Sequence, residues 1–350
     1  MKRTAVFLIA VLLAILLPFL GVVVSDSHVR PGASFRWAAF LIYALVIAAL
    51  VGPFVRRAVR ARDSGPRPVR RRPFPRWGWL GVGLVLVAWV FAWTRFAWFA
   101  PLQLYTFTPL WLGYILVINA LTFRRTGRCI LLDRPRCFTA LFPASAAFWW
   151  YFEYLNRYVG NWHYLGVESI TALEYFVHAT ISFSTVLPAV LSTRDWLASF
   201  PRLVAGFTRF WRLRFAGSKA FAWVLLILGA TAFFGVGAWP QHLYAMVWVA
   251  PLLVLTSLQA LVGRSNLLAD LTHGNWTTAL LPALAALACG FLWEMWNWKS
   301  LAHWEYTIPL VHRFLIFEMP VLGYAGYLPF GLVCAAIGDI VCGDAKTETA

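Results

Sequence analysis

Residues 291–332, FLWEMWNWKSLAHWEYTIPLVHRFLIFEMPVLGYAGYLPFGL, carry two glutamates beside strongly apolar runs. Glu294 and Asn297 lie three residues apart near the end of one run, and Glu318 stands at the entrance to the next. Residues three apart share one face of a helix. Because ionisable groups within membrane runs are rare and functional by default, this stretch indicates a buried polar site.

An earlier stretch repeats the arrangement: residues 149–190 read WWYFEYLNRYVGNWHYLGVESITALEYFVHATISFSTVLPAV. Glu153 and Asn156 repeat the E-x-x-N spacing, and Glu174 occupies the place that Glu318 has in the later copy. Four aromatic residues extend the correspondence: Trp162 with Trp304, and Tyr164 with Tyr306. The chain therefore contains two related segments that each carry acidic residues within apolar sequence.

The composition is that of a membrane protein. Of 350 residues, 61% are hydrophobic and 13% charged, and the mean hydropathy is +0.69. A soluble domain of this composition would lack the polar surface that water requires, so we predict an all-α, polytopic membrane helix bundle. The formal net charge of +16 comes mainly from Arg in connecting stretches. In a membrane protein this pattern indicates topology and contact with anionic lipid headgroups, and we expect no nucleic-acid partner.

The apolar runs predict about ten transmembrane helices. They lie at roughly 1–24, 35–54, 77–99, 108–123, 138–155, 171–191, 219–240, 243–262, 277–298 and 314–337. The first run is interpreted as a retained helix rather than a cleaved signal, because no small-residue cleavage site closes it. The predicted divisions are an N-terminal hairpin (1–55), a basic Pro-rich cytoplasmic linker (56–76), repeat 1 (77–191), a basic cytoplasmic loop (192–218), repeat 2 (219–337) and a tail (338–350).

Arginine sets the predicted orientation. The linker Arg56–Arg76 contains nine Arg and four Pro, and loops 124–136 and 192–218 are also rich in Arg. With ten crossings all three fall on one side, which the positive-inside rule makes cytoplasmic. We therefore predict a bacterial cytoplasmic (inner) membrane protein with both termini in the cytoplasm, and with Arg56–Arg76 resting on anionic lipid headgroups.

The duplication extends beyond the glutamates, because residues 121–156 align with 258–297. Each copy would contain four helices, and an even number of crossings gives both copies the same orientation. The E-x-x-N pairs and the later glutamates then fall in the outer half of the bilayer. From equal depth we hypothesise that Glu153, Glu174, Glu294 and Glu318 converge on one cavity.

The four glutamates are the candidate catalytic residues. An ionised carboxylate at the bilayer centre costs about 3 kcal/mol, so these groups should face the bundle interior. In a desolvated interior a glutamate can hold its proton near neutral pH, as a general acid must. We predict Glu294 and Glu318 as the leading acid–base pair, with Glu153 and Glu174 as their partners in repeat 1. The alternative is that Glu and Asn only bridge helices as polar contacts.

Aromatic and polar neighbours of the glutamates are the candidate substrate-binding residues. Inward aromatic faces would stabilise a cation or line a tunnel for an elongated apolar ligand, whereas outward ones would form an interfacial belt. The predicted set is Asn156, Asn297, His178, Trp150, Trp293, Trp304, Tyr324 and Tyr327. No metal or other cofactor is predicted, since the His residues show no metal-binding spacing. The five Cys also lack such spacing and are expected to be reduced or buried packing residues.

The duplicated layout resembles the small integral-membrane lycopene cyclases of bacteria and fungi and the related carotenoid hydratases. The resemblance covers roughly 108–191 and 243–337, and rests on a run ending in a Trp–acid pattern, a short W-x-Y segment and an acid-led run. The usual P-x-E-E of that family is Leu173-Glu174-Tyr175 and Phe317-Glu318-Met319 here. The resemblance implies redox-neutral acid–base chemistry on a polyene or isoprenoid lipid, without a cofactor.

Three functions are compatible with the sequence. The first is an intramembrane enzyme of the lyase or isomerase type acting on an apolar lipid. The second is a transporter or proton-coupled carrier with the Glu and Asn pairs as its binding site, which would favour carboxylates near mid-depth. The third is a non-catalytic scaffold, in which replacing Glu by Gln would be harmless because glutamine still hydrogen-bonds between helices.

Overall fold

The structure, a computed structural model, describes residues 2–25, 32–60, 72–264 and 266–343. The N-terminal half contains α1 (Lys2–Ser25), α2 (Trp37–Arg60), α3 (Arg76–Trp93), η1 (Ala97–Tyr105), α4 (Phe107–Thr126), α5 (Ile130–Asp133), α6 (Pro135–Val159), β1 (Trp162–Leu165), α7 (Ala172–Phe183) and α8 (Val186–Ala198). The rest contains α9 (Pro201–Phe207), η2 (Arg214–Gly217), α10 (Lys219–Ala238), α11 (Pro240–Leu243), α12 (Met246–Leu261), α13 (Leu267–Thr272), α14 (Thr277–Asn297), β2 (His303–Tyr306), β3 (Leu315–Ile316), β4 (Met319–Pro320), η3 (Val321–Gly326) and α15 (Tyr327–Cys342). The all-α class is confirmed.

Eight helical segments of the described chain are long and apolar enough to cross a membrane. They correspond to eight of the ten predicted runs, so the protein is an integral, multi-pass membrane protein. The remaining two runs are also helical, as α6 and α12, but α12 is shorter than the eight and α6 is not among them. A count of ten crossings therefore stays a prediction.

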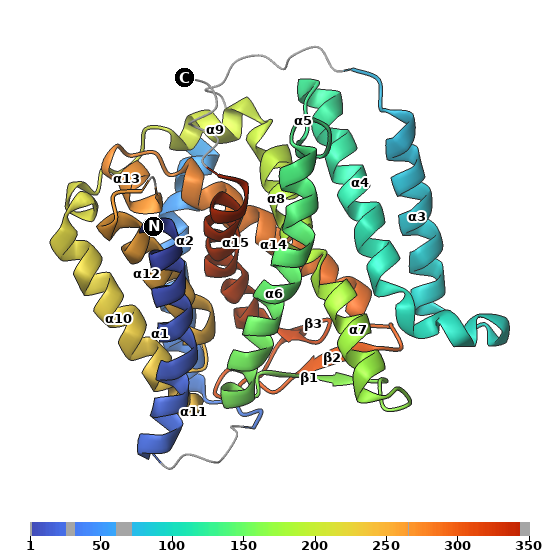
Figure 1. Cartoon of the computed structure of the whole chain (residues 1–350), viewed down its shortest axis with the longest axis horizontal. Helices are drawn as coiled ribbons and strands as arrows, with labels where there is room; N and C mark the ends of the chain where they lie inside the picture. Colours follow the sequence, from blue (N-terminus) through green and yellow to red (C-terminus); the bar gives the residue numbers. More distant parts are fainter. Residues whose placement is uncertain (1, 26–31, 61–71, 265, 344–350) are drawn as a thin grey trace.

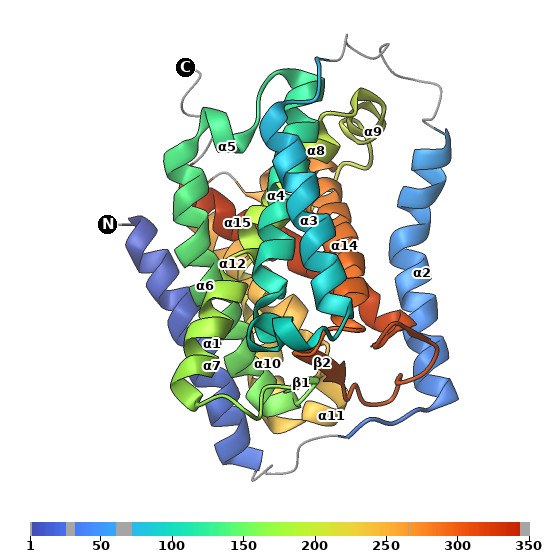
Figure 2. The same cartoon turned by 90° about the vertical axis from the view of Figure 1, so that its right-hand side faces the viewer.

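Strands close one end of the bundle, and α5 and α9 lie at the opposite end (Figures 1 and 2). That opposite end is rich in Arg, since segments 56–60, 124–136 and 194–214 reach it. At the Arg-rich end, the Arg57 guanidinium donates to the Gly206 carbonyl at 2.8 Å, and the Arg72 N–H donates to the Arg124 carbonyl at 2.8 Å. The predicted basic segments thus meet at one end, although residues 61–71 of the linker lie outside the described residues. The compartment that this end faces remains a prediction from the positive-inside rule.

The first two helices do not form the predicted hairpin as a packed pair. Helix α1 packs against α10 and α12, whereas α2 lies against α9 and η3 on another side of the bundle (Figure 2). No residue of α2 is buried. Helix α2 is therefore a peripheral wall, while α1 is part of the bundle.

Glycines allow α1 and α10 to approach closely. A Cβ atom added at Gly237 would overlap the carbonyl oxygen of Pro18, and one added at Gly21 would overlap that of Phe234. Small residues at such crossings bring helix backbones close together, and the resulting van der Waals packing contributes to helix association in lipid.

Replacing Gly237 by Val should separate these helices and lower stability by roughly 2 kcal/mol or more, because the added side chain meets backbone rather than a flexible side chain. Gly83→Val is the matched control, since a Cβ at Gly83 meets nothing within 4 Å. Thermal unfolding in detergent, followed by size-exclusion chromatography, measures the difference. Equal midpoints for the two variants would contradict the close packing of α1 and α10.

The expectation that the five Cys are reduced or buried packing residues is wrong for two of them, which are oxidised. Cys137, near the start of α6, and Cys342, at the end of α15, form a disulfide across 205 positions of sequence. Cys129, Cys289 and Cys334 are free and buried. Local spacing cannot reveal this bridge, because only the packing of α15 beside α6 brings the two thiols together.

Candidate functional site

A two-stranded antiparallel ribbon, β1 with β2, joins the two copies of the sequence motif. Trp162 lies opposite Tyr306 and Tyr164 lies opposite Trp304, with His163 facing Glu305 at the centre. The Trp of each copy thus lies opposite the Tyr of the other copy, so a local two-fold axis relates the two strands. The ribbon lies at the end of the bundle away from the Arg-rich segments (Figure 1).

Each E-x-x-N asparagine holds the start of the strand that follows its helix. Asn297 accepts from the Trp304 N–H at 2.7 Å and donates to the Trp304 carbonyl at 2.7 Å. Asn156 donates to the Trp162 carbonyl at 2.7 Å and accepts from the N–H groups of Asn161 and Trp162. Both side chains are buried and neither lines the cavity described below. Their geometry supports a structural role in place of the predicted ligand-binding role.

Glu294 is completely buried at the end of α14. Its Oε1 accepts hydrogen bonds from the hydroxyls of Tyr306, at 2.7 Å, and Tyr327, at 2.6 Å. The Trp304 indole in turn donates to the Tyr306 hydroxyl at 2.9 Å. The other oxygen, Oε2, is buried without a hydrogen-bond partner among the described residues. An unpaired buried oxygen is costly, so this carboxyl group is retained at the expense of stability.

Glu153, in α6, forms the corresponding cluster of the first copy. Its Oε1 accepts from the indoles of Trp149 and Trp162, each at 3.0 Å, and from the Tyr164 hydroxyl at 2.6 Å. Glu153 is partly rather than fully buried. Burial, followed by the nearby carboxyl groups, raises the pKa of Tyr164 in β1 and of Tyr306 in β2 well above their ordinary values. Both phenols are thus held as neutral donors toward a glutamate.

Glu174 and Glu318 form none of the hydrogen bonds described for these clusters and do not line the cavity described below. The hypothesis that four carboxylates converge on one cavity is therefore wrong, although Glu318 lies near enough to Glu294 to interact with it electrostatically. Glu174 is exposed at the first turn of α7, where its carboxylate accepts from the Thr171 N–H at 2.7 Å as half of a capping box. Glu318 lies in the tight turn between β3 and β4, directly after Phe317 with its φ of 56°. The predicted helix over 314–337 begins only at Tyr327, since β3, β4 and η3 precede it.

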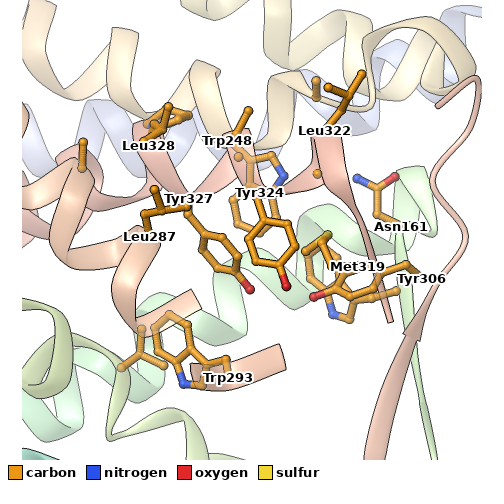
Figure 3. A pocket seen from close by; sticks show the side chains of 18 of the residues that line it. Asn161, Trp248, Leu287, Trp293, Tyr306, Met319, Leu322, Tyr324, Tyr327 and Leu328 are labelled. Atoms are coloured by element: carbon orange, nitrogen blue, oxygen red, sulfur yellow. The ribbon is translucent and has the colours of Figure 1, made fainter. Parts of the chain in front are cut away.

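A cavity of about 890 Å³ lies beside the two Glu clusters. The cavity is lined by Trp162, Tyr164, Tyr306 and Tyr327, so Glu153 and Glu294 each reach it through their aromatic partners. Figure 3 shows the hydroxyls of Tyr324 and Tyr327 turned to the same side, with Tyr306 beside Met319.

The cavity continues away from the ribbon along α2. One face of that helix lines it with Tyr43, Ile47, Leu50, Val51 and Phe54, and α14 contributes Ala279, Leu280, Ala283, Leu284 and Leu287. Such a volume lies within the usual range for ligand-binding cavities, and its walls are mostly apolar and aromatic. The shape is suited to a long apolar molecule.

Most of the predicted substrate-binding residues line this cavity. They are His178, Trp293, Trp304, Tyr324 and Tyr327. Trp150 does not; its indole donates to the Thr180 hydroxyl at 2.9 Å and its ring stacks on Phe176. Like Asn156 and Asn297, Trp150 is therefore outside the cavity wall. For Trp150 the cause is simple, because consecutive residues of a helix point in different directions and it is the Trp149 indole that reaches Glu153.

Several cavity residues were not predicted as site residues. The tyrosines Tyr164 and Tyr306 lie two positions after Trp162 and Trp304, and this W-x-Y spacing places Trp and Tyr on one face of a strand. Reading those segments as strands would therefore have predicted both donors. Asn161 and Trp248 have no comparable signal in the sequence. Among the residues that the structure describes, no three His, Cys, Asp or Glu side chains lie together in a way that would hold a metal ion.

Comparison with known proteins identifies no relative. No family model, no curated protein and no solved structure matches the chain.

Proposed function

We propose that this membrane protein is an enzyme that carries out redox-neutral acid–base chemistry on an apolar isoprenoid or polyene lipid. The observation that carries the proposal is the contact of a large apolar cavity with Tyr306 and Tyr327, whose hydroxyls bind the fully buried Glu294. The resemblance to lycopene cyclases and carotenoid hydratases agrees with this chemistry. The acid–base pair is revised to Glu294 and Glu153, because Glu318 lies in a hairpin turn.

The cavity supports a lipid as the substrate. Its walls run from aromatic residues at the ribbon to aliphatic residues of α2 and α14, so an extended chain would bury apolar surface along its length. Trp162 stacks on Trp248, with ring centroids 5.6 Å apart, and both line the cavity. Aromatic faces at this position would stabilise a carbocation formed on the chain.

The two clusters support a reaction in which one carboxyl group supplies a proton to the lipid and the other takes a proton from it. In the structure the Tyr327 hydroxyl donates to Glu294 Oε1. For the transfer this hydroxyl turns toward the cavity, its oxygen accepts the proton of Glu294 in its acid form, and it gives its own proton to a carbon–carbon double bond. The resulting carbocation then loses a proton from a neighbouring carbon to Glu153 through the Tyr164 hydroxyl, and a new double bond forms. The net reaction is an isomerisation or cyclisation without gain or loss of electrons, and the two carboxyl groups then exchange one proton to restore the starting state.

The test compares lipid extracts from a strain that lacks the gene with extracts from the same strain carrying the wild type, Glu294→Gln, Glu153→Gln or Glu168→Gln. Glu168→Gln is the control, since Glu168 is an exposed loop residue at the same end of the molecule. We expect one lipid to accumulate in the null strain and in the two cluster variants, while the wild type and the control convert it.

Two other outcomes would overturn the proposal when protein levels are equal. If both cluster variants convert the lipid as well as the wild type, the carboxyl groups serve only as contacts between helices. If the null and wild-type extracts are identical, no lipid is converted, and transport of a lipid becomes the next function to assay.

A further inference from the structure

Asn161 is a buried polar residue in the wall of an otherwise apolar cavity. It lies between the end of α6 and the start of β1, and its side chain is 3% exposed. Its Oδ1 has no hydrogen-bond partner among the described residues. Figure 3 shows the amide nitrogen on the side of Tyr324 and the amide oxygen turned away from it. The unpaired Oδ1 costs free energy, and a ligand that pairs with it after the amide has turned over would gain that energy back.

The backbone of Asn161 is fixed on both sides. Its N–H donates to Asn156 Oδ1 at 2.8 Å, and its carbonyl accepts from the Thr307 N–H at 2.9 Å. The preceding carbonyl, of Gly160, accepts from the Thr307 hydroxyl. Because these contacts hold the main chain, the amide stays in the cavity wall and can only turn about its own side-chain bonds. A fixed polar group of this kind orients a ligand rather than following it.

Charge at the cavity limits the chemistry of that ligand. Among the described residues that line the cavity there is no Asp, Glu, Lys or Arg. The lining includes two histidines, His178 and His303, and His303 Nε2 already lies 3.8 Å from Glu305 Oε1. A phosphate or carboxylate on the ligand would therefore lose its hydration without gaining a permanent opposite charge, which is unfavourable. The polar group of the ligand is therefore neutral.

The amide also selects among neutral groups. In its present orientation the Asn161 amide nitrogen can donate a hydrogen bond, so the ligand must accept one. If the amide turns over, Oδ1 faces the ligand and accepts, so the ligand must donate a hydrogen bond. A hydroxyl does both and satisfies either orientation, whereas an ether or a ketone satisfies one. A hydrocarbon satisfies neither and leaves the amide unpaired.

We propose that the cavity binds a neutral, long-chain lipid alcohol whose hydroxyl pairs with Asn161, which makes Asn161 a specificity-determining residue. This inference rests on the proposed function, because it names the class of lipid on which the Glu clusters would act. The apolar chain lies along α2 and α14, and the hydroxyl lies at the ribbon.

Binding measurements on the purified full-length protein in lipid nanodiscs test this inference without requiring turnover. The probe is a tritiated C20 prenyl alcohol, displaced in turn by the unlabelled alcohol, by the matching hydrocarbon without the hydroxyl, and by the prenyl diphosphate. We expect the wild type to bind the alcohol about tenfold more tightly than the hydrocarbon, and the diphosphate more weakly than the alcohol. Asn161→Leu should bind alcohol and hydrocarbon equally, with its hydrocarbon affinity undiminished.

Retained hydrocarbon binding shows that Asn161→Leu is folded. Asn266→Leu, the same replacement at the N-cap of α13, should keep the wild-type preference. The inference is overturned if the wild type does not distinguish alcohol from hydrocarbon, if the diphosphate binds best, or if Asn161→Leu keeps the preference. Each of these results leaves the lipid-extract test of Glu294 and Glu153 untouched, so failure of this inference and failure of the proposed function are distinguishable.

Discussion

Replacing Tyr327 by Phe is expected to lower conversion of the accumulated lipid about 100-fold while leaving lipid binding within a few-fold of the wild type. The Tyr327 hydroxyl is the group that lines the cavity and also reaches Glu294 Oε1, at 2.6 Å. Phenylalanine keeps the ring but breaks the path from the buried carboxyl to the ligand. The measurement is a comparison of turnover and affinity in the same nanodisc preparation.

Tyr324→Phe provides the comparison for this prediction. Tyr324 lines the same cavity, but its hydroxyl donates to the Ile316 carbonyl at 3.1 Å rather than to a carboxyl group. We expect a loss of less than about tenfold, because no proton path is broken. If the two variants lose turnover equally, or if Tyr327→Phe loses binding instead of turnover, Tyr327 does not carry a proton from Glu294.

Replacing Asn297 by Leu is expected to destabilise the protein by about 2–4 kcal/mol, since the buried N–H and carbonyl of Trp304 would both lose their partner. For a chain of this size the loss should lower the unfolding midpoint by roughly 3–5 °C. Asn156→Leu should act similarly at Trp162. Tryptophan fluorescence during heating in detergent follows the transition.

Asn266→Ala provides the reference loss of stability against which these asparagine variants are compared. Asn266 accepts from the Ala269 N–H at the start of α13, and loss of such a cap costs about 1 kcal/mol. The two ribbon variants should each exceed this loss, and combining them should give less than the sum, because both act on one ribbon. Midpoints no lower than that of Asn266→Ala would show that the ribbon does not depend on these side chains.

The sequence was a good guide where a signal was local. Apolar runs predicted the helical membrane protein, and E-x-x-N spacing predicted that Glu294 and Asn297 lie on a common face near the end of a buried helix. The same spacing predicted the pair in α6. These features follow from residues a few positions apart, whose relation is set by the geometry of one helix.

The sequence was a poor guide where a contact joins distant segments. The ribbon pairs Trp162 with Tyr306, and the disulfide joins Cys137 to Cys342; neither contact leaves a local pattern. Glu318 was misplaced because its apolar neighbours favour a helix, whereas the chain forms a hairpin with Phe317 in the left-handed region. Glu318 and Glu174 align in sequence, but they occupy different structures: Glu174 lies in the first turn of a helix and Glu318 in a hairpin turn.

The peripheral position of α2 determines which concentration of a substrate would set the occupancy of the cavity. This helix has no buried residue, yet one of its faces lines the cavity. A ligand that entered beside it would pass from the lipid acyl chains into the protein without entering water. Occupancy then depends on the mole fraction of the ligand among the lipids, not on its bulk molarity. Diluting a fixed amount of ligand with inert phospholipid would slow the reaction as dilution with solvent slows a soluble enzyme.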